Sequence, residues 1–282
     1  MTNELIQKLR ELAEKYEVPD FCTNDPSRFL RWYEPEKGRG TVADVEAASF
    51  IAAMLAFGNR KQFIPKIEQI LQIADRSKGS VSSWLKSNSY KNDFPNGNQK
   101  FYRFYSFNDM QIFFEELAKI LNSSTTLGTF LQEGKAFPSL QPATQSSATL
   151  SNGGQKLAPR NAPQALPLCD QLALAFPRSA IVPKGRTSAN KRINMFLRWM
   201  VRRNSPVDLG LWQWADPAAL IIPLDTHVMH EAAGLNLIPQ KCAASRKTAE
   251  LLTAALCKAF PNDPCRGDFA LFGLGVDESQ NP

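Results

Sequence analysis

The stretch VEAASFIAAMLAF, residues 45–57, is apolar on nearly every face of a helix and indicates the centre of a helical core. Asp44 stands directly before it, at a position where a carboxylate can cap a helix, so we expect a buried helix over residues 44–57. The apolar run from Ala47 to Gly58 is too short to cross a bilayer, which takes about 20 residues. The stretch therefore predicts a protein that folds around one central helix.

Helical periodicity continues outward from this stretch in both directions. An apolar stripe from Leu5 to Tyr16 has helix spacing, and alternation typical of strands is scarce. Short apolar runs such as Ile181-Val182 end in proline and are typical of connectors. The fold class we predict is all-α, with further helices over residues 61–74, 80–87, 109–121, 189–203, 226–235, 245–260 and 268–274.

One long segment interrupts the helical pattern. Residues 135–169 are rich in Pro, Ser, Gln, Asn, Ala and Gly and contain no acidic residue, a composition that buries little apolar area. We interpret residues 135–170 as a low-complexity linker or insertion. It separates an N-terminal helical part, residues 1–134, from a C-terminal helical part, residues 171–282.

The composition excludes several classes of protein. With 282 residues, 43% hydrophobic and 21% charged, the chain is neither collagen-like, nor wholly disordered, nor a disulfide scaffold. Its five cysteines form no C-x-x-C pair, which argues against a thiolate-held cluster or a structural zinc. Residues 1–17 lack the hydrophobic stretch of a signal peptide, so we expect a cytoplasmic protein without a membrane partner.

The positive charge of the chain is concentrated in one stretch. The formal net charge is +6, while residues 171–207 contain eight basic and no acidic residues, so the rest of the chain sums to −2 (6 − 8). Such a concentration is typical of a surface that binds phosphates. The alternative is a solvated helix face with acidic residues folded over it.

The helix that begins near Lys191 carries much of this charge. It places Lys191, Met195, Arg198 and Arg202 on one face, which we expect to point into a cleft or solvent, and apolar side chains on the other. In the first helical turn the helix dipole disfavours a positive charge, so Lys191 should lose its proton more easily than a free lysine. An amine nucleophile requires this, although a lysine that only contacts phosphate or solvent remains the alternative.

The stretch PLDTHVMH, residues 223–230, begins another predicted helix. Asp225 is first of all its N-cap, and a capping carboxylate that also faces a cleft can act as a base or stabilise a cation. His227 and His230 follow within one turn and are weak candidates for metal ligands. Three residues in one turn do not close a coordination shell, so we expect no metal and no other cofactor.

These motifs resemble the helix–hairpin–helix DNA glycosylase superfamily, which includes endonuclease III and the 8-oxoguanine glycosylases. Pro-Leu-Asp-Thr-His-Val precedes a helix that runs into Ala-Gly-Leu, and the KRINMF stretch, residues 191–196, is similar to the archaeal 8-oxoguanine branch. Residues 192–202 and the DFALFG stretch, residues 268–273, look like an uncharacterised bacterial family allied to this superfamily. The resemblance covers residues 178–275 and is compatible over 47–71. The superfamily's Leu-Pro-Gly-Val-Gly hairpin is degenerate over residues 183–187, and its cluster cysteines are absent.

The resemblance implies two helical subdomains that flank a cleft, and a glycosylase/AP lyase of DNA base-excision repair that acts on a damaged base such as an oxidised purine. Lys191 would form a Schiff base with the sugar, and Asp225 would accept a proton and stabilise the cationic sugar. Phe57 and Asn59 would enter the gap or the minor groove of double-stranded DNA, with RNA as an alternative partner, and we expect a monomer. Phosphate contacts would come from Lys184, Arg186, Arg192, Arg198, Arg202, Asn59 and Arg60, and base stacking from Phe57, Trp199, Trp212 and Trp214.

Two other functions remain open at this point. One is a nucleic-acid-binding protein that keeps the scaffold without catalysis, and the other is a metal-dependent hydrolase centred on Asp225, His227 and His230. If Lys191 and Asp225 line one open cleft, catalysis is favoured. A buried Asp225 that only caps its helix, with Lys191 pointing away, would favour binding alone.

Overall fold

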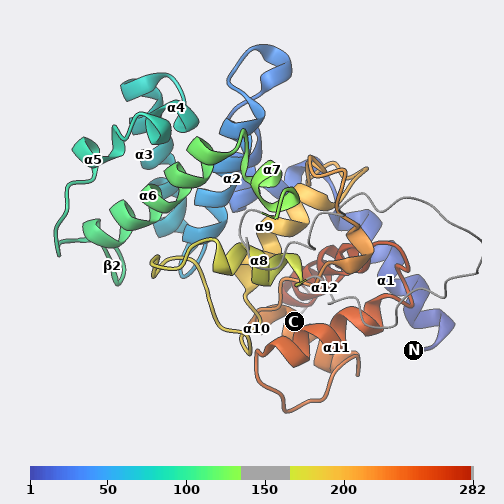
Figure 1. Ribbon diagram of the computed structural model, residues 1–282. Helices are drawn as coiled ribbons and strands as arrows, with labels where there is room; N and C mark the ends of the chain where they lie inside the picture. Colours follow the sequence, from blue (N-terminus) through green and yellow to red (C-terminus); the bar gives the residue numbers. More distant parts are fainter. Residues whose placement is uncertain (135–165, 281–282) are drawn as a thin grey trace, which may run out of the picture.

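The computed structural model describes residues 1–134 and 166–280, with side chains to residue 275 (Figure 1). Most of the predicted linker, residues 135–165, lies outside the described residues. Helix α8 (Leu168–Leu174) begins inside the range assigned to the linker, because Cys169, Leu172 and Ala173 are buried against the core. Within the described residues, the predicted all-α class is confirmed except for one two-stranded hairpin.

The apolar stretch at residues 45–57 forms the predicted central helix, α2 (Val42–Leu55), and every residue from Ala43 to Leu55 is buried. Its start differs from the prediction. Thr41 is the N-cap, and Asp44 accepts from the Thr41 backbone N–H at 2.8 Å, which completes a capping box. The helix ends at Leu55, so Phe57 lies in the following connection, before Asn59 caps the next helix.

One group of helices surrounds α2 in the first half of the chain. Aromatic rings fill its core, among them Phe50, Phe94, Phe113 and Trp84, each at most 1% exposed. Strands β1 (Lys100–Tyr102) and β2 (Tyr105–Ser106) pair antiparallel at its edge, beside α6. The helices of this group are α3 (Arg60–Lys78), α4 (Val81–Lys86), α5 (Tyr90–Asp93), α6 (Phe107–Ser123) and α7 (Leu127–Gln132).

A second group combines the two ends of the described chain. Helix α1 (Asn3–Tyr16) packs along α12 (Gly267–Gln280), as Figure 1 shows. Gly273 permits this contact, since a Cβ there would lie 2.0 Å from the Tyr16 ring. Helices α10 (Thr226–Gly234) and α11 (Arg246–Leu256) complete the group, and short 3-10 helices connect the elements: η1 (Pro19–Asn24), η2 (Pro26–Arg31), η3 (Pro35–Lys37), η5 (Pro217–Ala219) and η6 (Pro264–Arg266).

Helix α9 (Lys191–Val201) packs on α2 and α8 and is buried from Ile193 to Val201. It joins the two groups, because its Arg198 pairs with Asp268 of α12. The two parts of the sequence are therefore interleaved in space: α1 packs with α12, and α9 with α2. None of the helices in the described residues is long and apolar enough to cross a membrane. A cavity opens between the groups, close to the first turn of α9.

Candidate active site

The backbone at the start of α9 fixes the position of Lys191. Asn190, directly before the helix, has a left-handed φ of 47°, which asparagine tolerates better than most residues. Its side-chain amide is buried and donates to the Gly185 carbonyl at 2.8 Å, which ties the helix start to the preceding connection. The predicted place of Lys191 in the first turn is confirmed. Asn190 was not recognised in the sequence, because only its backbone conformation reveals its role.

Asp225 caps α10 as predicted and also contacts Lys191. Its Oδ1 accepts from the backbone N–H groups of His227, at 3.0 Å, and Val228, at 2.9 Å. Its Oδ2 lies 2.7 Å from the Lys191 Nζ, with the two side chains 27% and 38% exposed. Burial would raise the pKa of Asp225, but the Lys191 ammonium and the Val228 N–H hold that pKa below its usual value.

Lys191 and Asp225 line the same open cavity, which has a volume of about 510 Å³. Met195 and Arg198 of α9 line it as well, so the predicted face of this helix borders a cleft over its first two turns, whereas Arg202 does not reach this cavity. Apolar walls with a few polar groups are typical of small-molecule sites. The walls come from α3, α10, α12 and the connection after α2, with side chains that include Phe21, Phe57, Phe63, Val228, Leu271 and Phe272.

Asp268, near the start of α12, also lines the cavity, although no local pattern in the sequence marks it as a site residue. Burial raises the pKa of its carboxyl to about 6, although the Arg198 guanidinium acts in the opposite direction. Arg198 donates a hydrogen bond to the Asp268 Oδ2. The DFALFG motif contains this residue, but its burial beside Lys191 and Asp225 depends on how α12 packs across the chain.

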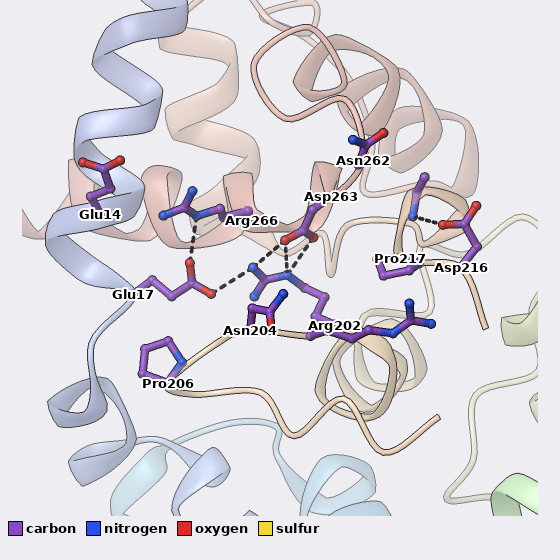
Figure 2. Close-up of a pocket in the computed structure, with 12 residues that line it drawn as sticks. Glu14, Glu17, Arg202, Asn204, Pro206, Asp216, Pro217, Asn262, Asp263 and Arg266 are labelled. Atoms are coloured by element: carbon purple, nitrogen blue, oxygen red, sulfur yellow. Dashed lines mark hydrogen bonds and ion pairs between the residues drawn. The ribbon is translucent and has the colours of Figure 1, made fainter. Parts of the chain in front are cut away.

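The structure contradicts the predicted exposure of Arg198 and Arg202, which are 2% and 1% exposed. Arg198 pairs with Asp208 and Asp268. Arg202 lies between Glu17 and Asp263 (Figure 2). Its Nη2 is 2.8 Å from the Glu17 Oε1 and 2.7 Å from the Asp263 Oδ2, and its Nη1 pairs with Asp208. Carboxylates distant in sequence therefore cover half of the α9 basic face. Neither guanidinium is free to meet a phosphate in this conformation.

Other cations of the basic stretch also have partners inside the protein. Arg192 donates to the Met54 carbonyl at the end of α2 and to the Tyr105 hydroxyl, which corrects its predicted place on a phosphate-binding surface. Arg178 pairs with Glu115 at 3.0 Å. Lys184 and Arg186 are exposed as predicted, with the Lys184 ammonium donating to the Pro177 carbonyl. The alternative of acids folded over the stretch therefore describes half of its eight cations: Arg178, Lys191, Arg198 and Arg202.

The loop after α2, whose Phe57 and Asn59 are expected from the resemblance to enter DNA, borders the cavity. Phe57 and Arg60 are among the lining residues, and Arg60 is 3.7 Å from the Asp25 carboxylate. Asn59 is exposed, and its side chain caps α3 by accepting from the Lys61 N–H. The loop thus lies on the wall of the cavity that also contains Lys191.

The tryptophans do not form the predicted stacking surface. Trp199 is fully buried, and Trp212 is buried with its indole N–H donating to Glu46 at 2.8 Å. Both belong to the core, so the structure contradicts their assignment as base-stacking residues. Trp214 is 38% exposed but stacks on Trp212 at 5.6 Å, and it is not among the residues that line the cavity.

Only one of the two histidines lines the cavity. His227 lines it, whereas the His230 side chain is 80% exposed and lies 3.2 Å from Glu231. Among the side chains described, those of residues 1–134 and 166–275, no group of three or more His, Cys, Asp or Glu could hold a metal ion. The metal-dependent hydrolase therefore gains no support from the side chains around Asp225.

Residues 25–277, nearly the whole chain and most of the cavity lining, match a family described as protein of unknown function (DUF2400). No curated protein and no solved structure matched the chain. Because this match covers nearly the whole chain, the protein belongs to the DUF2400 family.

Proposed function

We propose that this protein is a DNA glycosylase/AP lyase of the helix–hairpin–helix type. The single observation that carries the proposal is the contact of Lys191 Nζ with Asp225 Oδ2 at 2.7 Å, on the wall of an open cavity. A lysine paired with a capping aspartate in a cleft supplies a nucleophile together with a group that can accept its proton. The resemblance of residues 178–275 to that superfamily agrees with this pairing.

The reaction follows from these two side chains. The Lys191 ammonium first gives up a proton, which Asp225 or solvent accepts, and the free amine then attacks C1′ of the nucleotide. The bond from C1′ to the base breaks, and the base leaves with the electron pair and takes up a proton. Ring opening leaves a protonated Schiff base on Lys191, and loss of a C2′ proton then eliminates the 3′ phosphate. The Asp225 carboxylate stabilises the positive charge that develops on the sugar.

The cavity supports an extruded nucleotide as the substrate. Enzymes that act on a base in duplex DNA move it out of the stack into a pocket. A volume of about 510 Å³ lies within the range of small-molecule sites, and aromatic walls from Phe21, Phe57 and Phe272 suit a flat base. We propose double-stranded DNA with a damaged base as the substrate, and an oxidised purine as the first lesion to test.

Borohydride trapping tests the lysine directly. The protein is incubated with duplex DNA that contains an abasic site or 8-oxoguanine, and sodium borohydride reduces any Schiff base to a stable cross-link. The wild type and the control Lys78→Gln, an exposed lysine at the end of α3, should cross-link, and Lys191→Gln should not. Equal trapping by Lys191→Gln would remove the lysine from the mechanism. DNA binding without trapping by the wild type would favour a non-catalytic nucleic-acid-binding protein.

A further inference from the structure

The β1–β2 hairpin presents an exposed aromatic side chain. Arg103 and Phe104 form its turn, and Arg103 has a left-handed φ of 51°. Phe104 is 60% exposed, more than any other large hydrophobic side chain in the described residues. The Phe104 ring contacts the rings of Phe57 and Tyr105, and the rest of its surface faces solvent.

The hairpin is fastened to the rim of the cavity. The Tyr102 hydroxyl donates to the Phe57 carbonyl, and the Phe57 ring contacts the Phe104 ring with centroids 5.3 Å apart. A Cβ on Gly58 would lie 2.1 Å from the Arg103 guanidinium, so this guanidinium rests directly on Gly58. Phe57 and Gly58 both line the cavity that contains Lys191. The tip of the hairpin therefore stands next to the entrance of the candidate active site.

Phe57 itself is not free to enter DNA. Its ring contacts three other rings, those of Tyr102, Phe104 and Tyr105, at 5.1 to 5.3 Å. The Arg192 guanidinium lies over the same ring, 5.0 Å from its centroid. These contacts make Phe57 a support for the hairpin, and they leave Phe104 as the exposed aromatic side chain of this cluster.

The charge around the hairpin matches a polyanion. Residues 94–108 contain no acidic residue, and Lys100 and Arg103 lie in the hairpin itself. Lys66, on α3, lies over the Phe101 ring at 4.6 Å. None of these three cations is in an ion pair found in the described part of the chain, whereas the buried arginines of α9 each have carboxylate partners. The Lys100 ammonium donates to the Phe104 carbonyl and the Arg103 guanidinium lies over the Phe57 ring, so these cations are held beside Phe104 without a carboxylate among the described residues to neutralise them. An aromatic side chain flanked by such cations suits the stacked bases and phosphates of a nucleic acid.

We propose that the hairpin is a DNA wedge: Phe104 stacks on the base pair left exposed when a nucleotide leaves the duplex for the cavity, while Lys66, Lys100 and Arg103 contact the flanking phosphates. The inference rests on the proposed function for its partner, duplex DNA. Apolar wedges of this kind are used by proteins that unstack and bend DNA. The role is independent of the chemistry at Lys191, because Phe104 touches the gap and not the sugar.

Fluorescence anisotropy with two duplexes tests the wedge, one fully paired and one with a tetrahydrofuran abasic analogue at its centre. The wild type should bind the abasic duplex more tightly. Phe104→Ala should lose about tenfold in affinity for it, from the loss of one stacking contact, and little for the paired duplex. Phe104→Trp should restore the preference. Leu174→Ala, which removes a side chain that is 44% exposed on α8, is the matched control and should bind like the wild type.

Each outcome decides the proposal. Unchanged abasic preference in Phe104→Ala, or equal losses for both duplexes, overturns the wedge even if borohydride trapping at Lys191 succeeds. Loss of preference in Phe104→Ala supports the wedge even if Lys191 traps nothing, in which case only the lyase proposal fails. If the wild type sediments as a dimer and Phe104→Ala as a monomer, the partner of Phe104 is a second copy of the chain, and the wedge proposal is overturned. Absence of any DNA binding by the wild type overturns both proposals.

Discussion

Replacing Arg202 with methionine should lower the free energy of unfolding by about 3–5 kcal/mol, the usual loss when one partner of a buried ion cluster is removed. Its side chain is 1% exposed and donates to Asp263 at 2.7 and 3.0 Å and to Glu17 at 2.8 Å. When the Arg202 guanidinium is removed, the buried Asp208 carboxylate keeps Arg198 as its one ion-pair partner among the described residues. Methionine fills part of the space but donates no hydrogen bond.

Urea unfolding followed by tryptophan fluorescence measures this loss, and an unchanged denaturant slope would show that the unfolded state is unaffected. Arg202→Lys keeps the charge without the planar fork and should lose less. Arg76→Met, at an exposed position near the end of α3, is the control and should stay within about 0.5 kcal/mol of the wild type.

The loss of stability in Arg202→Met should depend on pH. Burial would raise the pKa of Glu17, but Arg202 lowers it below the ordinary value of 4.5. The ion pair therefore stabilises the fold above pH 4.5 and is lost as the pH falls through the lowered pKa. The difference between the wild type and Arg202→Met should shrink on acidification. If Arg202→Met instead unfolds like the wild type and weakens DNA binding, the buried-cluster reasoning is wrong and Arg202 contacts phosphate.

Three further predictions concern the cavity. Asp225→Asn should reduce borohydride trapping by about 10²–10⁴-fold, because the proton acceptor is lost. Its free energy of unfolding should fall by less than about 1 kcal/mol, because asparagine also caps helices. Trapping at the wild-type rate would contradict this prediction. Burial raises the pKa of Asp268 from 3.8 to about 6, so the folded state binds this proton more tightly than the unfolded state and stability should fall as the pH rises through that window. Asp268→Asn should abolish this fall in pH-dependent urea titrations, with the surface variant Asp20→Asn as control. Gly58→Ala should cost about 1–3 kcal/mol by thermal or urea unfolding, since its φ is +82° and its Cβ would meet the Arg103 guanidinium; an unchanged midpoint would show that this contact is loose.

Local patterns in the sequence predicted most helices and the two residues at the centre of the site. The first turn of α9 and the cap of α10 are read from short stretches, so Lys191 and Asp225 could be placed on their helices in advance. The hairpin was missed because its two short strands show little alternation. Asp268 was missed because its burial comes from packing between α9 and α12, which no local pattern encodes.

Helix periodicity and capping are local properties, so the all-α class, the buried helix α2, and a lysine and an aspartate at two helix starts follow from short stretches of the sequence. The partners of the charged side chains depend instead on how the helices pack. Electrostatic partners form across any sequence distance, so Glu17 and Asp263 could reach Arg202 and remove it from the surface. The same packing brought Lys191 Nζ within 2.7 Å of Asp225 and set Phe104 at the rim of their cavity. The stretch that looks like a basic surface in the sequence is thus in part a buried ion cluster, beside a cavity with apolar walls.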